Sequence, residues 1–88
     1  MLKEKVAVIT GGSRGIGAEV AYKLASLGAD IAIIYAGNEE AANKVAERCE
    51  NEYSVKVRTY RCNVADFDEV KTTVGQIKAD FGTVNILV

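Results

Sequence analysis

Apolar residues along the chain gather in short runs that are separated by longer stretches with helical spacing. Two nearly unbroken apolar runs cover 5–10 and 31–35, whereas residues 55–60 alternate apolar and polar side chains. We expect a β-strand in each, with the second strand fully buried and the third near a sheet edge. A further apolar run, 84–88, predicts a fourth strand.

The stretch 15–27 predicts a first helix, because its large aliphatic residues recur at intervals of three or four. The side chains expected to face the core are Ile16, Val20, Leu24 and Leu27. Gly28 follows directly and is expected to end this helix, since glycine readily adopts the left-handed backbone found at helix ends.

A second helix is expected after the turn at Gly37-Asn38, with Asn38 as its N-cap. The acidic side chains of Glu39 and Glu40 suit the positive end of the helix dipole. The residues expected to form its buried stripe are Ala42, Val45, Ala46 and Cys49.

A third helix is predicted to begin at Asp66, because Glu69 follows three residues later as in a capping box. Gly82 is expected to end it. Its apolar stripe has the most regular helical spacing in the chain and consists of Phe67, Val70, Val74, Ile77 and Phe81.

The predicted order of elements is β-α-β-α-β-α-β. Strands separated by helices of about 10–15 residues indicate an α/β fold with a parallel sheet and right-handed crossovers. No repeat or linker interrupts the pattern, so we expect residues 1–88 to form a single domain.

Composition narrows the functional classes. A hydrophobic content of 49% with a net charge of -1 excludes intrinsic disorder, and a nucleic-acid binder would carry a basic excess. No apolar stretch is long enough to span a membrane, and residues 1–5 lead straight into a strand, so neither a membrane span nor a signal peptide is expected. The absence of histidine argues against imidazole catalysis and most zinc sites, and no metal site is expected.

The two cysteines, Cys49 and Cys62, do not form a C-x-x-C pair. We expect free thiols in a reducing, cytoplasmic compartment, and we regard a disulfide or a metal site as the less favoured alternative.

The segment 10–17, called here the glycine loop, reads Thr-Gly-Gly-Ser-Arg-Gly-Ile-Gly and joins the first strand to the first helix. Such a loop brings backbone N–H groups and a helix N-terminus close to an anion, and glycine lets a pyrophosphate approach the backbone. The alternative is a tight turn that merely requires glycine. The spacing of Gly11, Gly15 and Gly17 between a buried strand and an amphipathic helix favours dinucleotide binding.

This loop resembles the cofactor loop of the short-chain dehydrogenase/reductase family, and segments 6–10, 34–40, 62–66 and 84–88 add to the resemblance. Within the family the chain is similar to the 3-oxoacyl-[acyl carrier protein] reductases of bacterial fatty-acid synthesis. The resemblance covers the whole chain but only the N-terminal part of the family fold. It implies an incomplete Rossmann-like sheet of strand order 3-2-1-4, with helices one and two on one face and helix three on the other. The cofactor contacts that it implies in the loop are Gly11, Ser13, Arg14, Gly15, Ile16 and Gly17.

Charge favours NADP(H) over NAD(H) as the cofactor. An NAD site usually carries an acidic residue at the end of the second strand, and Tyr35 occupies that position. Arg14 could pair with a 2′-phosphate, although it could also be a solvated loop cation, and Asn38 could add a hydrogen bond. Glu39 and Glu40 would oppose a phosphate unless they point into solvent.

The resemblance also assigns an adenine contact to Asn63 and Val64. The family usually has Asp-Val here, so Asn63 departs from the pattern, although an amide still donates and accepts hydrogen bonds. A role for Asn63 in capping the turn is the equally weighted alternative.

The catalytic signature of the family, Tyr-x-x-x-Lys, does not occur in these residues. The residues four positions after the tyrosines are Ser26, Glu39, Val57 and Val64. We therefore assign no catalytic residue and expect no turnover by the chain alone.

Acyl carrier protein is the partner implied for a complete enzyme, and an exposed edge at 86–88 predicts association with another strand or a second copy. The alternatives are another reductase of this family, a non-catalytic NADP(H)-binding module, and an interaction domain that docks through the fourth strand.

Overall fold

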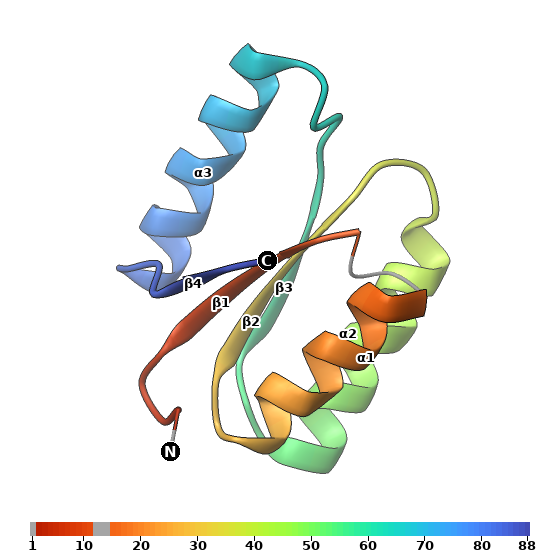
Figure 1. Cartoon of the computed structure of the whole chain (residues 1–88), viewed down its shortest axis with the longest axis vertical. Coiled ribbons are helices and arrows are strands. Elements are labelled where there is room, and N and C mark those ends of the chain that lie inside the picture. Colours follow the sequence, from red (N-terminus) through yellow and green to blue (C-terminus); the bar gives the residue numbers. More distant parts are fainter. Residues whose placement is uncertain (1, 12–14) are drawn as a thin grey trace.

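The computed structural model describes residues 2–11 and 15–88. Its elements follow the predicted order and are β1 (Val6–Thr10), α1 (Gly15–Ser26), β2 (Asp30–Tyr35), α2 (Glu39–Tyr53), β3 (Val57–Arg61), α3 (Phe67–Phe81) and β4 (Ile86–Leu87). The strands form one parallel sheet in the order β3-β2-β1-β4 (Figure 1). The predicted α/β class and strand order are confirmed.

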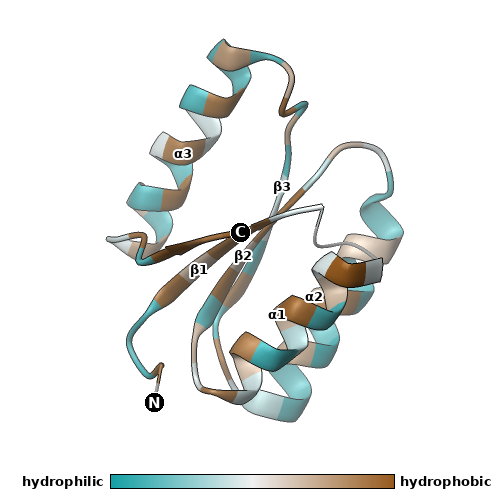
Figure 2. Cartoon of the chain, in the orientation of Figure 1, coloured by the Kyte–Doolittle hydropathy of each residue, from teal (hydrophilic) through white to brown (hydrophobic). Residues whose placement is uncertain are grey.

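Two apolar layers lie on opposite faces of the sheet. Helices α1 and α2 cover one face and α3 covers the other, as expected (Figure 1). Side chains of β2 alternate between the layers: Ile31 and Ile33 pack towards α1 and α2, whereas Ala32 and Ile34 pack towards α3. Hydrophobic residues predominate along β1, β2 and β4, whereas β3 is largely hydrophilic and α2 and α3 carry many hydrophilic residues (Figure 2).

The buried face of α1 differs from the predicted one. The residues buried against the sheet are Ala18, Ala21 and Ala25. Ile16 is 84% exposed, while Val20 and Leu24 are only partly buried at the margin of the core. Small alanine side chains let the helix approach closely to a sheet surface that already carries large isoleucines. Close packing therefore buries the alanine face of α1 and leaves the larger aliphatic residues at its margin.

The stripe of α3 is only partly buried, which corrects another expectation. Ile77 is fully buried and Val70 and Phe81 pack beside it, but Phe67 is 78% exposed and Val74 also reaches solvent. In the part of the chain that the structure describes, α3 is the only helix on its face of the sheet. The strands therefore cover the centre of the stripe and leave its margins open.

The predicted N-caps of α2 and α3 and the predicted end of α3 are confirmed. The side chain of Asn38 accepts a hydrogen bond from Ala41 N at 2.9 Å, and that of Asp66 accepts one from Glu69 N at 3.2 Å. Gly82 ends α3 with a φ of 86°. The predicted stripe of α2, which includes Val45 and Cys49, is buried throughout.

The edge strands are shorter or shifted relative to the prediction. β3 begins at Val57, and Lys56 N, just before it, donates to the side chain of Asp30 at 2.9 Å. β4 is extended by Val88 N, which donates to Val8 O at 2.9 Å. β4 is an outer strand of the four-stranded sheet and Leu87 on it is 75% exposed, whereas association through this strand stays a prediction.

The two thiols lie in the core layers on opposite faces of the sheet, Cys49 on the buried side of α2 and Cys62 in the layer that α3 covers, and both are free and buried. Burial raises the pKa of Cys49 to about 11. Among residues 2–11 and 15–88, no helix has the length and apolar character needed to cross a membrane.

Candidate functional site

The carboxyl ends of the parallel strands meet at one edge of the sheet, and three connections leave from there. They are the glycine loop after β1, residues 36–38 after β2, and residues 62–66 after β3. In open α/β sheets, ligands bind in the crevice outside this edge. Most of the residues that the sequence singled out therefore lie along a single edge.

The structure describes residues 10–11 and 15–17 of the glycine loop, and two glycines there have a left-handed backbone. Gly11 has a φ of +66° and Gly15 a φ of +63°, a left-handed backbone that strains other residues. A Cβ built on either glycine would meet no atom of residues 2–11 and 15–88 within 4 Å. Ser13 and Arg14 lie outside the described residues, and their predicted contacts stay predictions.

The N-terminus of α1 suits an anion. Its first turn carries no acidic side chain, whereas α2 and α3 each carry two acidic residues there. The positive end of the α1 dipole is thus not neutralised by its own first turn. Gly17, in this turn, is partly buried, and Ile16 points into solvent. The open backbone and this helix end together fit the pyrophosphate of a dinucleotide.

The end of β2 presents no carboxylate. The side chain of Tyr35 is only 8% exposed and packs in the core with α1 and α2. The Oδ1 atom of Asn38 is engaged as the N-cap of α2. Glu39 and Glu40 are exposed on α2, and Glu40 lies 3.6 Å from the Lys44 ammonium.

The turn after β3 shows the turn-capping role of Asn63, whereas its predicted adenine contact stays a prediction. Its Oδ1 atom accepts a hydrogen bond from Ala65 N at 3.0 Å, which is the turn-capping role. Val64 is 59% exposed at the same turn. The carboxylate of Glu69 accepts from Asn63 N at 2.9 Å, instead of completing the capping box at Asp66 N. Sequence reasoning missed this contact, because capping-box spacing directs Glu69 to a nearer amide.

Tyr60, which is as buried as Tyr35, is held by contacts with the end of α3. Tyr60 OH donates to Asp80 Oδ2 at 2.6 Å, and Lys56 Nζ donates to the backbone oxygen of Asp80 and lies 4.7 Å from the ring of Phe81. Burial, together with the hydrogen bond to Asp80, raises the pKa of Tyr60. These contacts join β3 and the residue before it to the end of α3.

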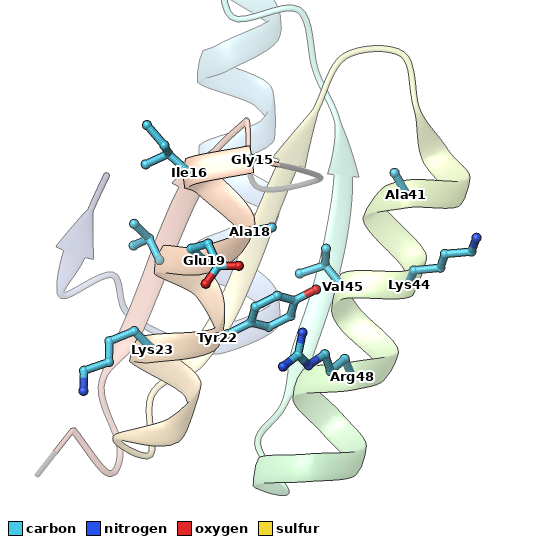
Figure 3. A pocket seen from close by; sticks show the side chains of 11 residues that line it. Gly15, Ile16, Ala18, Glu19, Tyr22, Lys23, Ala41, Lys44, Val45 and Arg48 are labelled. Atoms are coloured by element: carbon cyan, nitrogen blue, oxygen red, sulfur yellow. The ribbon is translucent and has the colours of Figure 1, made fainter.

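A groove of about 820 Å³ lies between α1 and α2 (Figure 3). Arg48 crosses it and lies 4.0 Å above the ring of Tyr22, while its Nε donates to Glu52 at 3.1 Å. The groove reaches the glycine loop at Gly15 and Ile16. Its other lining residues lie along the neighbouring sides of the two helices, from Ala18 to Lys23 on α1 and from Ala41 to Arg48 on α2.

A family model described as short chain dehydrogenase matches residues 5–88. The chain belongs to the short-chain dehydrogenase family. Members of this family are NAD- or NADP-dependent oxidoreductases.

An NADP-dependent mannitol dehydrogenase of Hypocrea jecorina is 44% identical over 99% of this chain and 34% of its own length. A 3-oxoacyl-[acyl-carrier-protein] reductase of Staphylococcus aureus is 40% identical over 100% of this chain and 35% of its own length. A short-chain dehydrogenase from Burkholderia cenocepacia, solved in complex with NADP, superposes with a TM-score of 0.93 at 38% identity, covering 98% of this chain and 35% of that protein. The chain thus spans about a third of the length of the curated relatives it matches.

Proposed function

We propose that this chain binds NADP(H) at the carboxyl edge of its sheet and forms the cofactor-binding part of a carbonyl reductase. The observation that carries the proposal is the α1 N-terminus, whose first turn has no acidic residue and which adjoins a left-handed Gly15. Backbone N–H groups and the helix dipole there favour a pyrophosphate. Membership of a family that uses nicotinamide cofactors supports the same ligand.

NADP(H) is favoured over NAD(H) by the end of β2. An NAD site places a carboxylate there for the ribose 2′-hydroxyl, and this chain has the buried, uncharged Tyr35. Glu40 is exposed and near Lys44, which reduces its opposition to a 2′-phosphate. Arg14, as a loop guanidinium, would add attraction.

The substrate class that we propose is a 3-oxoacyl thioester carried by acyl carrier protein, reduced at its keto group. The sequence resemblance and the Staphylococcus aureus relative support this choice. The second candidate is a ketose–polyol pair, because the mannitol dehydrogenase of Hypocrea jecorina is more similar in sequence, at 44% identity. No described residue has been assigned to substrate selection, so assays on the two substrates must decide between them.

We propose that residues 1–88 alone do not turn over substrate. When bound, the nicotinamide supplies the hydride, but protonation of the substrate oxygen needs a Tyr-x-x-x-Lys pair that these residues lack. The contribution of this chain is binding: the glycine loop receives the pyrophosphate, and the ends of β2 and β3 receive the adenosine half.

Isothermal titration calorimetry of the 88-residue chain, with NADPH and separately with NADH as the ligand, tests the proposal. We expect NADPH to bind more tightly than NADH by about tenfold, equivalent to about 1.4 kcal/mol. Gly75→Ala, on the exposed side of α3, is the control variant and should bind as the unmodified chain does. If neither cofactor binds, the proposed site is contradicted, and if NADH binds more tightly, the proposed cofactor preference is contradicted. In a separate activity assay with NADPH, reduction of a 3-oxoacyl thioester by this chain would contradict the expected inactivity.

A further inference from the structure

The turn after β3, residues 62–66, is fixed at both ends by hydrogen bonds. Cys62 N donates to Tyr35 O at 2.9 Å, which fastens the turn to the carboxyl end of β2. At its far end, Asp66 N donates to Asn63 O at 3.0 Å. Between these points Val64 presents an apolar side chain to solvent.

A third connection comes from outside the turn. Glu69, in the first turn of α3, accepts the hydrogen bond from Asn63 N through its Oε1 atom at 2.9 Å. Because the acceptor is a carboxylate, this bond is stronger than a bond between neutral groups. The same residue donates its own backbone N–H to Asp66. Glu69 therefore fixes the backbone at Asn63 relative to the start of α3.

We propose that Glu69 is a positioning residue for the adenine end of the cofactor, acting through the backbone of Asn63 and the exposed Val64. This inference rests on the proposed function, which puts the adenosine half of NADP(H) along the ends of β2 and β3. A turn that is ordered before the ligand arrives loses less conformational entropy on binding. Removing the Glu69 contact leaves the other hydrogen bonds of the turn in place but lets the backbone at Asn63 and Val64 move.

A role of Glu69 in helix stability alone would have other consequences. Asp66 already supplies the N-cap of α3, and Asp68 supplies an equal charge in the same first turn. Asp68→Ala therefore removes the same charge from the same helix end, without touching the contact to Asn63 N. It is the matched control for Glu69→Ala.

The experiment uses the 88-residue chain and two probes, 2′,5′-ADP for the adenosine half and inorganic pyrophosphate for the glycine loop. Affinities are read from amide chemical shifts, which also report the Asn63 N–H directly and show whether each variant is folded. We expect Glu69→Ala to weaken 2′,5′-ADP about three- to tenfold, the range that one hydrogen bond represents, and to leave pyrophosphate affinity unchanged. Glu69→Gln retains an acceptor oxygen and should restore affinity to within about twofold of the unmodified chain.

Three results would overturn the inference. The first is an affinity of Glu69→Ala for 2′,5′-ADP equal to that of the unmodified chain. The second is an equal loss of both ligands, which would indicate a general loss of structure. The third is an equal effect of Asp68→Ala, which would assign the effect to helix charge. If the unmodified chain binds neither probe, the proposed function itself is wrong, an outcome distinct from a failure confined to Glu69.

Discussion

Replacing Gly15 by alanine tests whether the backbone of the glycine loop has the conformation described above. Gly15 has a φ of +63°, and a Cβ built on it meets none of the described residues within 4 Å. Gly75 is the matched comparison. It also has no atom within 4 Å of a built Cβ, but it lies in the right-handed backbone of α3. The two substitutions therefore add the same group to equally open sites and differ in backbone conformation.

The expected changes have opposite signs. An alanine held in the left-handed region costs about 1–2 kcal/mol, part of which is offset by the reduced entropy of the unfolded chain. We expect Gly15→Ala to lower the free energy of unfolding by about 1 kcal/mol. In a helix interior alanine is favoured over glycine by about 0.8–1.0 kcal/mol, so Gly75→Ala should raise it by a similar amount.

Urea unfolding monitored by circular dichroism measures both changes in the free energy of unfolding. Thermal unfolding gives a second measurement: for a domain of this size, 1 kcal/mol corresponds to about 4–8 °C in melting temperature, so one variant should melt below and the other above the unmodified chain. NADPH should raise the melting temperature of the unmodified chain and of Gly75→Ala, and it should raise that of Gly15→Ala less, because the new methyl group occupies space beside the proposed pyrophosphate site. The reasoning is refuted if Gly15→Ala is as stable as the unmodified chain, or if both substitutions shift stability in the same direction.

The remaining predictions concern the two cores. Because Ile77 is fully buried, Ile77→Ala should lower the free energy of unfolding by about 2–5 kcal/mol, measured by urea unfolding. Val74→Ala, at the exposed margin of α3, should lower it by less than about 1 kcal/mol, and equal losses would contradict the described packing. The raised pKa of Tyr60 favours the neutral phenol in the folded chain, so stability is retained below the unfolded pKa of about 10 and lost as pH rises above it. The fall in urea midpoint between about pH 9 and 11 should thus be shallower in Tyr60→Phe, and an unchanged slope would refute the assignment. Cys49 and Cys62 are both buried, and burial raises the pKa of Cys49 to about 11, so labelling of either thiol by a disulfide reagent should follow urea unfolding; rapid labelling of the native chain would be inconsistent with this burial.

Sequence reasoning succeeded where the signal was local. Asn38 and Asp66 cap the helices that they were predicted to cap, and Gly28 and Gly82 have the positive φ angles expected after a helix. Each of these features depends on a few neighbouring residues. The strand order 3-2-1-4 is not local in this sense; it came from the family resemblance together with the alternation of strands and helices.

The sequence misled where several elements compete for the same space. Ile16 and Phe67 belong to regular helical stripes but are exposed, whereas Ala21 is fully buried. Periodicity identifies which residues share a helical face, but it does not say how much of that face a neighbouring element covers. Similarly, the carboxylate of Glu69 bonds to an amide six residues earlier, because the path of the turn brings Asn63 N closer to it than the capping-box partner.

By itself, the sequence determined the order of strands and helices, their caps, the glycine loop and the missing catalytic pair, because periodicity, turn chemistry and motif spacing are properties of neighbouring residues. Only the tertiary structure decided which side of α1 meets the sheet, that Tyr35 lies in the core, and that Glu69 holds the turn after β3. These outcomes depend on shape and distance between segments far apart in the chain, where close packing and the satisfaction of buried polar groups select one arrangement.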